Sequence, residues 1–206
     1  MLLLIPSVNA FYDTFQYHPN DDLTNADTVY NTIWYIEQTP TYSEVKIITE
    51  EVNNKIVYMH AGCKDAGNLY CAKIRLTSPQ ACSNYWSFYV GDVESGLGGS
   101  SYWGAYIRFY NSSGGYINSS KELYSYFVSY DNSQWELLRS GNTIALYVNG
   151  EYIDDIGGTW DEMPCYIEFY LTCKECSTPP LRIRIDNIMT TDNGVISALP
   201  LDWYIL

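Results

Sequence analysis

The sequence predicts an all-β protein, a single-domain antiparallel β-sandwich of the jelly-roll type, and three observations support this. Period-2 segments bounded by Gly, Pro, Asn and Ser recur along the chain, whereas hardly any stretch has a helical period. Of the 206 residues, 47% are hydrophobic and 17% are charged, which is typical of a folded chain. Aromatic residues make up 16%, and 21 residues are tyrosine, which favours strands.

Short segments with strand-like alternation follow one another from the N-terminal to the C-terminal part of the chain. The segments expected to be strands are Ala10–Tyr17, Thr32–Ile36, Glu44–Glu50, Lys55–Ala61, Cys71–Thr77, Tyr85–Val90, Trp103–Tyr110, Tyr126–Tyr130, Trp135–Arg139, Thr143–Val148, Glu151–Ile156, Cys165–Leu171 and Leu181–Met189.

The clearest unit is a three-strand meander that begins at Trp135. Its second turn is Asn149-Gly150, the preferred type I′ pair, because both positions take a positive φ that matches the twist of the flanking strands. In the middle strand, one face carries only large aliphatic side chains, and we expect it to contact the core. These side chains are Ile144, Leu146 and Val148.

The domain is expected to span residues 11–192. Its last strand alternates aliphatic and charged residues from Leu181 to Asp186, as a half-buried strand does. Residues 1–10 are interpreted as the end of a secretory signal peptide or as an N-terminal apolar strand. Residues 193–206 form an apolar C-terminal tail.

The charge excludes some partners. With 11 Lys and Arg against 24 Asp and Glu, the net charge is −13, which argues against nucleic acid because phosphate binding needs basic residues. No apolar run approaches the ~18 residues of a membrane span.

Cysteines and glycosylation motifs indicate a secreted protein. The six cysteines favour disulfides over zinc, because only one C-x-x-C pair and two histidines are present. The favoured pairs are Cys63–Cys71, Cys82–Cys165 and Cys173–Cys176, among fifteen possible connectivities. Asn111 and Asn118 begin N-x-S motifs beside a Gly-Gly turn and are candidate glycosylation sites.

The order of these motifs resembles the concanavalin-A-like lectin and glucanase superfamily over residues 10–192. The resemblance is carried by the segment Phe11-Tyr12-Asp13-Thr14-Phe15, by Trp34, by Trp135 with Leu146-Tyr147-Val148-Asn149-Gly150, and by Leu181-Arg182-Ile183-Arg184-Ile185-Asp186-Asn187-Ile188. It implies two packed antiparallel sheets, especially like those of laminin-G-like and carbohydrate-binding domains. It also implies a structural Ca²⁺ bound by Asp186, with Asp13 facing it; the alternative is an Asp186 that points to solvent or pairs with a neighbouring arginine.

Catalytic motifs are missing from the sequence. The glucanases of this superfamily carry E-x-D-x-x-E or E-x-D-x-E, and neither occurs here. Asp154-Asp155 and Asp161-Glu162 are adjacent pairs, whose side chains point to opposite faces of a strand. We therefore expect the chain not to be an enzyme.

Two loops combine aromatic and acidic residues, as a sugar-binding site does. They hold the candidate ligand-binding residues Tyr102, Trp103, Asp92, Trp160 and Asp161. The predicted function is a non-enzymatic extracellular recognition module that binds a glycan or a surface glycoprotein, as in adhesion. The alternative is a structural subunit of an extracellular assembly that self-associates through its apolar termini.

Overall fold

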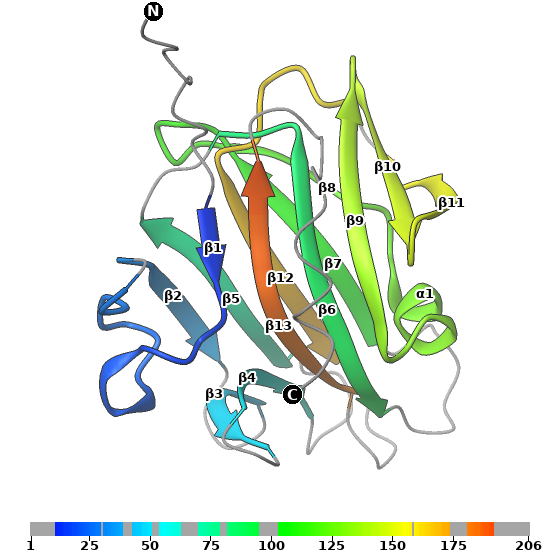
Figure 1. Cartoon of the computed structure of the whole chain (residues 1–206). Helices are drawn as coiled ribbons and strands as arrows, with labels where there is room; N and C mark the ends of the chain where they lie inside the picture. The colour runs from blue at the N-terminus through cyan, green and yellow to red at the C-terminus, as the bar shows by residue number, and fades with distance from the viewer. Residues whose placement is uncertain are drawn as a thin grey trace, which may run out of the picture.

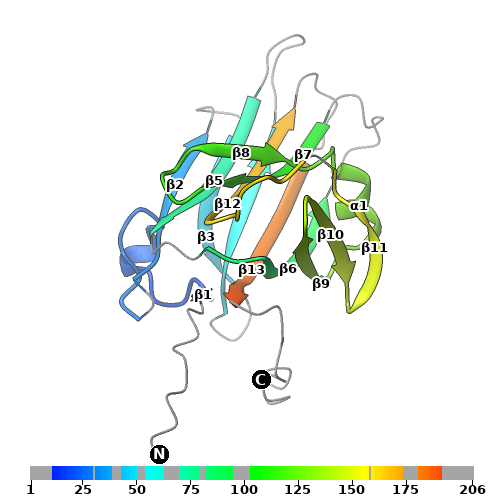
Figure 2. The ribbon, with the colours of Figure 1, turned by 90° about the horizontal axis from the view of Figure 1, so that it is seen from above.

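The computed structural model describes residues 11–29, 31–38, 43–50, 54–62, 70–78, 82–94, 103–157, 159–173 and 181–191. These residues form two antiparallel sheets packed face to face, with one short α-helix at the side (Figure 1). Seen from above, β8, β7 and β12 lie in one layer and β13, β6 and β9 in the other (Figure 2). The prediction of a single β-sandwich is confirmed.

The larger sheet has eight strands. In order across the sheet, seven of them are β11 (Glu151–Asp155), β10 (Thr143–Val148), β9 (Ser133–Ser140), β6 (Tyr85–Glu94), β13 (Leu181–Thr191), β4 (Lys55–Ala61) and β3 (Ser43–Thr49). The eighth, β1 (Phe11–Asp13), pairs with the end of β13 that β4 leaves open, with Asp13 opposite Ile188. The first and last described strands are therefore neighbours.

The smaller sheet has five strands. In order they are β2 (Ile33–Gln38), β5 (Tyr70–Ser78), β12 (Tyr166–Cys173), β7 (Trp103–Tyr110) and β8 (Tyr116–Ser119). A 3-10 turn, η1 (Pro19–Asp21), lies between β1 and β2.

Aromatic and aliphatic side chains fill the space between the sheets. Phe88 of the larger sheet meets Phe169 of the smaller sheet edge to face, with ring centroids 4.8 Å apart. The predicted aliphatic row of the meander is buried, with Ile144, Leu146 and Val148 no more than 4% exposed. Because every second residue of a strand points to the same face, this packing leaves the alternate side chains on the outer faces.

One predicted strand is a helix. Residues 126–130 belong to α1 (Tyr124–Ser129) and its C-terminal cap. The helix packs Phe127 flat against Trp135, with ring centroids 4.6 Å apart, and Leu123 beneath it is fully buried. This i, i+4 spacing places both side chains toward the core, so tertiary packing outweighs the strand preference of Tyr, Phe and Val. The structure also contains β8, which the sequence did not predict.

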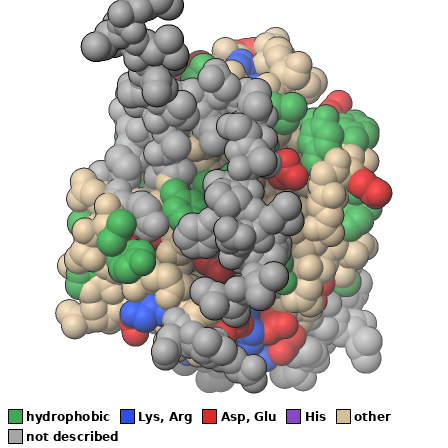
Figure 3. Space-filling view, viewed as in Figure 1, with side chains coloured by type: hydrophobic (Ala, Val, Ile, Leu, Met, Phe, Trp, Pro, Cys, Tyr) green, Lys and Arg blue, Asp and Glu red, His purple; other side chains and the backbone are tan. Residues whose placement is uncertain are grey.

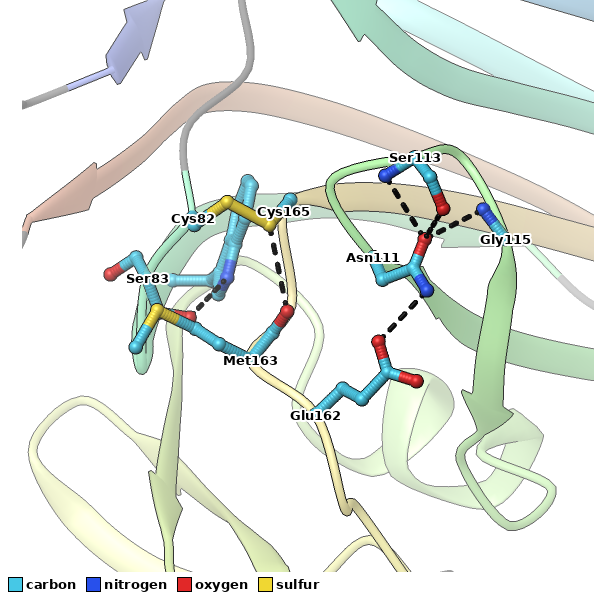
Figure 4. The surroundings of a disulfide bond; sticks show 9 residues. Cys82, Ser83, Asn111, Ser113, Gly115, Glu162, Met163 and Cys165 are labelled. Atoms are coloured by element: carbon cyan, nitrogen blue, oxygen red, sulfur yellow. Dashed lines mark hydrogen bonds between the residues drawn. A yellow bond between two sulfur atoms is a disulfide. The ribbon is translucent and has the colours of Figure 1, made fainter.

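The disulfide between Cys82 and Cys165 is confirmed. It joins the chain just before β6 of the larger sheet to the chain just before β12 of the smaller sheet, so it links the two layers (Figure 4). The predicted pairs Cys63–Cys71 and Cys173–Cys176 involve residues 63 and 176, which lie outside the described residues. The predicted N-terminal segment 1–10 and tail 193–206 lie outside them as well.

Candidate active site

Polar and aromatic side chains line the outer face of the five-stranded sheet. The inner residues of its central strands are core side chains such as Ile74, Ile107 and Phe169. Their neighbours along each strand therefore point outward. Strand pairing arranges these outward residues in rows. One row is Tyr35, Arg75, Glu168, Arg108 and Ser119, and the next is Glu37, Lys73, Tyr170 and Tyr106.

Glu168 lies at the centre of this face, on the central strand β12. Its side chain is 5% exposed. The Tyr110 hydroxyl donates a hydrogen bond to Oε2 of Glu168 at 3.0 Å, and the Arg108 guanidinium donates to Oε1 at 3.4 Å. A buried carboxylate is costly unless such donors accompany it, and here each oxygen has one.

The phenol of Tyr110 keeps its proton at neutral pH. Burial raises the pKa of Tyr110, and the negative charge of Glu168 together with the hydrogen bond between them raises it further. The pair therefore consists of a protonated phenol and the carboxylate that can accept its proton, oriented by Arg108.

Cations and tyrosine rings alternate around this pair. The Arg108 guanidinium lies 3.8 Å from the ring centroid of Tyr170, and Lys73 lies on the same ring at 5.0 Å. Lys73 also forms an ion pair with Glu37 at 2.8 Å. Burial alone would lower the pKa of Lys73, but the hydrogen bond and charge of Glu37 outweigh burial and raise it. Flat tyrosine rings beside fixed charges are suited to sugars, whose C–H faces stack and whose hydroxyls hydrogen bond.

A pocket of about 190 Å³ opens at one end of the face. Its walls include Arg75, Tyr110, Tyr166 and the turn at residues 112–114. Cys165, which directly precedes Tyr166, is bonded to Cys82 (Figure 4). The disulfide therefore anchors this wall of the pocket.

The predicted sugar-binding residues do not come together. Trp160 is 0% exposed, lies edge to face with Phe109 at 5.2 Å, and donates its indole N–H to the Gly157 carbonyl. Its ring is therefore part of the core and is not available to stack on a sugar. Asp161 beside it is exposed; Tyr102 lies outside the described residues, and Trp103 begins β7.

Asp92 belongs to the opposite side of the molecule. It forms an ion pair with Arg184, which also pairs with Glu50, on the outer face of the eight-stranded sheet. A second pocket of about 190 Å³ there is lined by these three residues and by Asp186 and Asn54, among others. Figure 3 views the molecule from this side, and acidic and basic side chains lie next to one another near its lower edge.

The two predicted calcium ligands differ in their surroundings. The carboxylate of Asp13 is fully buried and already accepts hydrogen bonds from the Phe15 N–H, the Thr32 hydroxyl and the Trp34 indole. It does not fit a calcium ligand, because its oxygens are occupied. Asp186 instead borders the acidic pocket, and calcium binding through it stays a prediction.

A buried cluster of Asp13, His18 and Asp27 has the residue types of a metal site, with ligand atoms within 4.8 Å of one another. In His18, however, Nδ1 meets the Asn25 carbonyl at 3.0 Å and Nε2 meets Asp13 at 3.1 Å. Both partners accept, so both ring nitrogens carry protons and neither can bind a metal. Burial lowers the pKa of His18, but hydrogen bonding and the charge of Asp13 outweigh it, and the net shift is upward. The cluster is a buried ion pair that anchors the segment between β1 and β2.

Both sequon amides are engaged in hydrogen bonds. Asn111 Nδ2 donates to Glu162 at 2.8 Å, as Figure 4 shows, and Asn118 Nδ2 donates to the Thr159 carbonyl at 2.9 Å. Glycosylation at these two positions stays a prediction.

The fold is similar to that of solved β-glucanases, which are concanavalin-A-like jelly-roll sandwiches. A β-glucanase of Bacillus licheniformis shares 9% identity, with 89% of this chain and 98% of that chain covered and a TM-score of 0.51. A β-1,3-1,4-glucanase (lichenase) from a mouse hindgut metagenome shares 11% identity, with 89% of this chain and 98% of that chain covered and a TM-score of 0.51. A Bacteroides ovatus GH16 protein, solved with its G4G4G3G product, shares 12% identity, with 88% of this chain and 99% of that chain covered and a TM-score of 0.53. No family model matches the sequence, and no curated protein sequence does.

These neighbours overturn two predictions, namely a non-enzymatic recognition module and a chain that is not an enzyme. Several solved structures with a similar sandwich are glycoside hydrolases by name, including an endo-β-galactosidase of Clostridium perfringens with a TM-score of 0.51. The predictions depended on a missing E-x-D-x-x-E motif, and a motif confined to one strand says nothing of residues that strand pairing brings together. At 9–12% identity the likeness itself concerns the fold, so the activity has to be argued from the site. Among the described residues, no helix is long and apolar enough to cross a membrane.

Proposed function

We propose that the chain is a carbohydrate-processing enzyme that cleaves glycosidic bonds on the outer face of its five-stranded sheet. The observation that carries the proposal is the pair formed by Tyr110 and Glu168, joined by a 3.0 Å hydrogen bond and flanked by Arg108. A nucleophile within hydrogen-bond reach of a base, with a third group that orients the base, is the arrangement that nucleophilic catalysis requires.

A second carboxylate is not close to Glu168 on the described face. The other acidic residue of the two rows, Glu37, lies two strands away on β2 and is paired with Lys73. Two strand spacings amount to about 10 Å, whereas paired carboxylates of retaining enzymes are about 5 Å apart. Some glycosidases use a tyrosine as the nucleophile, and Tyr110 is in the position for this role.

In the proposed reaction, the Tyr110 oxygen attacks the anomeric carbon while Glu168 takes the phenol proton. The bond from the anomeric carbon to the leaving oxygen breaks on the opposite face of the sugar, and this oxygen takes a proton from solvent, because Glu168 lies on the side of Tyr110. Water then attacks the same carbon from the face that the leaving oxygen vacated and gives a proton to solvent. The Tyr110 oxygen departs and regains its proton from Glu168. The raised pKa of Tyr110 explains why the base has to act at the same time as the attack.

The proposed site of action is outside the cell. The Cys82–Cys165 disulfide supports this, since such bonds persist in oxidising compartments. The proposal includes the substrate, which is a free glycan or the glycan of a cell-surface glycoprotein.

The test is the release of reducing sugar from a panel of oligosaccharides and polysaccharides. We expect Glu168→Gln and Tyr110→Phe each to lower kcat at least ~100-fold, because each removes one half of the pair. Glu151→Gln and Tyr152→Phe make the same chemical changes on β11, at the far edge of the other sheet, and should leave kcat unchanged. A folded wild-type protein without activity on any glycan, or a fully active Glu168→Gln, would refute the proposal.

A further inference from the structure

We infer that the substrate is an acidic carbohydrate and that Arg75 binds its anionic group, a carboxylate or a sulfate, in the pocket beside Tyr110. The inference rests on the proposed function, whose substrate class it specifies. It depends on the surroundings of Arg75, on the geometry of the pocket and on the charge of the chain.

Arg75 has no carboxylate within 4.0 Å among the residues that the structure describes, although acidic residues outnumber basic ones by 24 to 11. Its cross-strand neighbour Glu168 is instead engaged by Arg108 and Tyr110. The Arg75 guanidinium lies near two rings, Tyr110 at 4.7 Å and Tyr35 at 5.3 Å. It also interacts with the Tyr110 hydroxyl, which opposes the upward shift of the Tyr110 pKa. A half-buried arginine without an acidic partner is a charge that a ligand can neutralise.

The geometry of Arg75 suits an anion with two or more oxygens. A guanidinium has five N–H donors, so Arg75 retains donors for a carboxylate or sulfate besides its interaction with the Tyr110 hydroxyl. Arg75 lines the pocket of about 190 Å³ together with Tyr110 and Thr77. An acidic group bound there would place the sugar that carries it next to the hydroxyl of Tyr110.

Charge limits the kind of acidic carbohydrate. The two described rows have a net charge of 3 − 2 = +1, whereas the whole chain has a net charge of −13. The charged residues of the rows are Lys73, Arg75, Arg108, Glu37 and Glu168. A long polyanion would be repelled by most of the surface, whereas one acidic group at the pocket meets a local cation. We therefore expect short acidic oligosaccharides, or glycans with isolated acidic sugars, to bind.

The experiment compares matched acidic and neutral ligands by isothermal titration calorimetry. The pairs are trigalacturonic acid and its methyl ester, sialyllactose and lactose, and a sulfated galacto-oligosaccharide and its desulfated form. The first two pairs test recognition of a carboxylate, and the third pair tests recognition of a sulfate. For any ligand that the wild type cleaves, binding is measured in Glu168→Gln.

We expect at least one acidic ligand to bind 10- to 100-fold more tightly than its neutral partner, as a charged hydrogen-bonded pair provides. Arg75→Gln should remove this difference. The control Arg182→Gln makes the same charge change on the opposite sheet, where Arg182 pairs with Glu94, and should keep the difference.

Equal binding of all acidic and neutral partners overturns the inference, and so does an acidic preference that survives in Arg75→Gln. Cleavage of neutral glycans that is unchanged in Arg75→Gln also overturns it, while the proposed function stands. Acidic preference that is lost in Arg75→Gln, together with no cleavage of any ligand, supports the inference and refutes the proposed function.

Discussion

At the scale of single residues, the structure shows how burial sets the behaviour of acidic groups. Asp186 on β13 is 6% exposed, and burial raises its pKa to about 6, although the Asn187 and Asn54 hydrogen bonds oppose the shift. The charges of Glu50 and Asp13 add to the increase. The unfolded chain has an Asp pKa near 3.8, so between these values only the folded state keeps the proton.

The first prediction concerns this difference. Since the folded state binds more protons, the free energy of unfolding should fall as the pH rises from about 4 to about 6, by up to roughly 3 kcal/mol from this group. In Asp186→Asn the dependence over this range should be flatter. Urea unfolding at several pH values measures it, and identical slopes for the two proteins would contradict the prediction.

The predicted calcium ion is tested on the same residue. A cation bound through Asp186 competes with the proton, so millimolar calcium should raise Tm more at pH 7 than at pH 5. Asp186→Asn should lose this increase. A wild-type Tm that is the same in calcium and in EDTA would exclude the site.

At the scale of elements, packing rather than local preference determines α1. Phe127 lies flat on Trp135, and its side chain is 1% exposed, whereas its neighbour Val128 is 43% exposed. Both residues favour strands, and only their surroundings explain why this segment is helical.

The second prediction follows from this contact. Phe127→Ala should lower the free energy of unfolding by about 3–5 kcal/mol, because it leaves a cavity against Trp135. Val128→Ala on the solvent side should change it by less than about 0.5 kcal/mol. Chemical denaturation measures both, and a similar cost for the two variants would mean that the helix does not depend on the aromatic stack.

The strands were predictable because their side chains alternate, as the buried row of β10 and the Leu181, Ile183 and Ile185 row of β13 show. β8 was missed because its four residues are half-exposed and have no apolar alternation. The candidate site was missed for a different reason. Tyr110 and Glu168 are 58 residues apart, and only the register of β7 against β12 brings them together.

The Trp160 prediction was wrong because loop composition does not show the direction of a side chain. The loop around Gly157 is tied to the molecule by hydrogen bonds, including those from Arg139 to the Trp160 carbonyl. These bonds fix the backbone of Trp160 while its indole fills the space beside Phe109. No local signal in a Gly-Gly-Thr-Trp segment distinguishes this arrangement from an exposed ring.

At the scale of the whole molecule, one covalent link joins the two layers in the described part of the chain. The Cys82–Cys165 bond closes a loop with a sequence separation of 83 residues. A loop of this length loses enough unfolded-state entropy on closure to stabilise the folded protein by about 4 kcal/mol.

The third prediction is that the double variant Cys82→Ser/Cys165→Ser unfolds at a Tm roughly 10 °C lower than the oxidised wild type. At temperatures below the new Tm, the double variant should keep most of the wild-type activity, because the pairing of β7 with β12 holds Tyr110 and Glu168 together without the disulfide. Differential scanning calorimetry and the sugar-release assay provide the two measurements. An unchanged Tm would show that the bond does not constrain the unfolded chain.

The burial of tryptophan determines which optical signal can report on this protein. The indoles of Trp34, Trp86, Trp135 and Trp160 are at most 1% exposed, whereas the outer face of the smaller sheet carries tyrosine. The emission of these four indoles should therefore be blue-shifted and shielded from aqueous quenchers, and should change mainly on unfolding. Ligand at the sheet surface should be visible instead in the near-ultraviolet absorption of phenol rings.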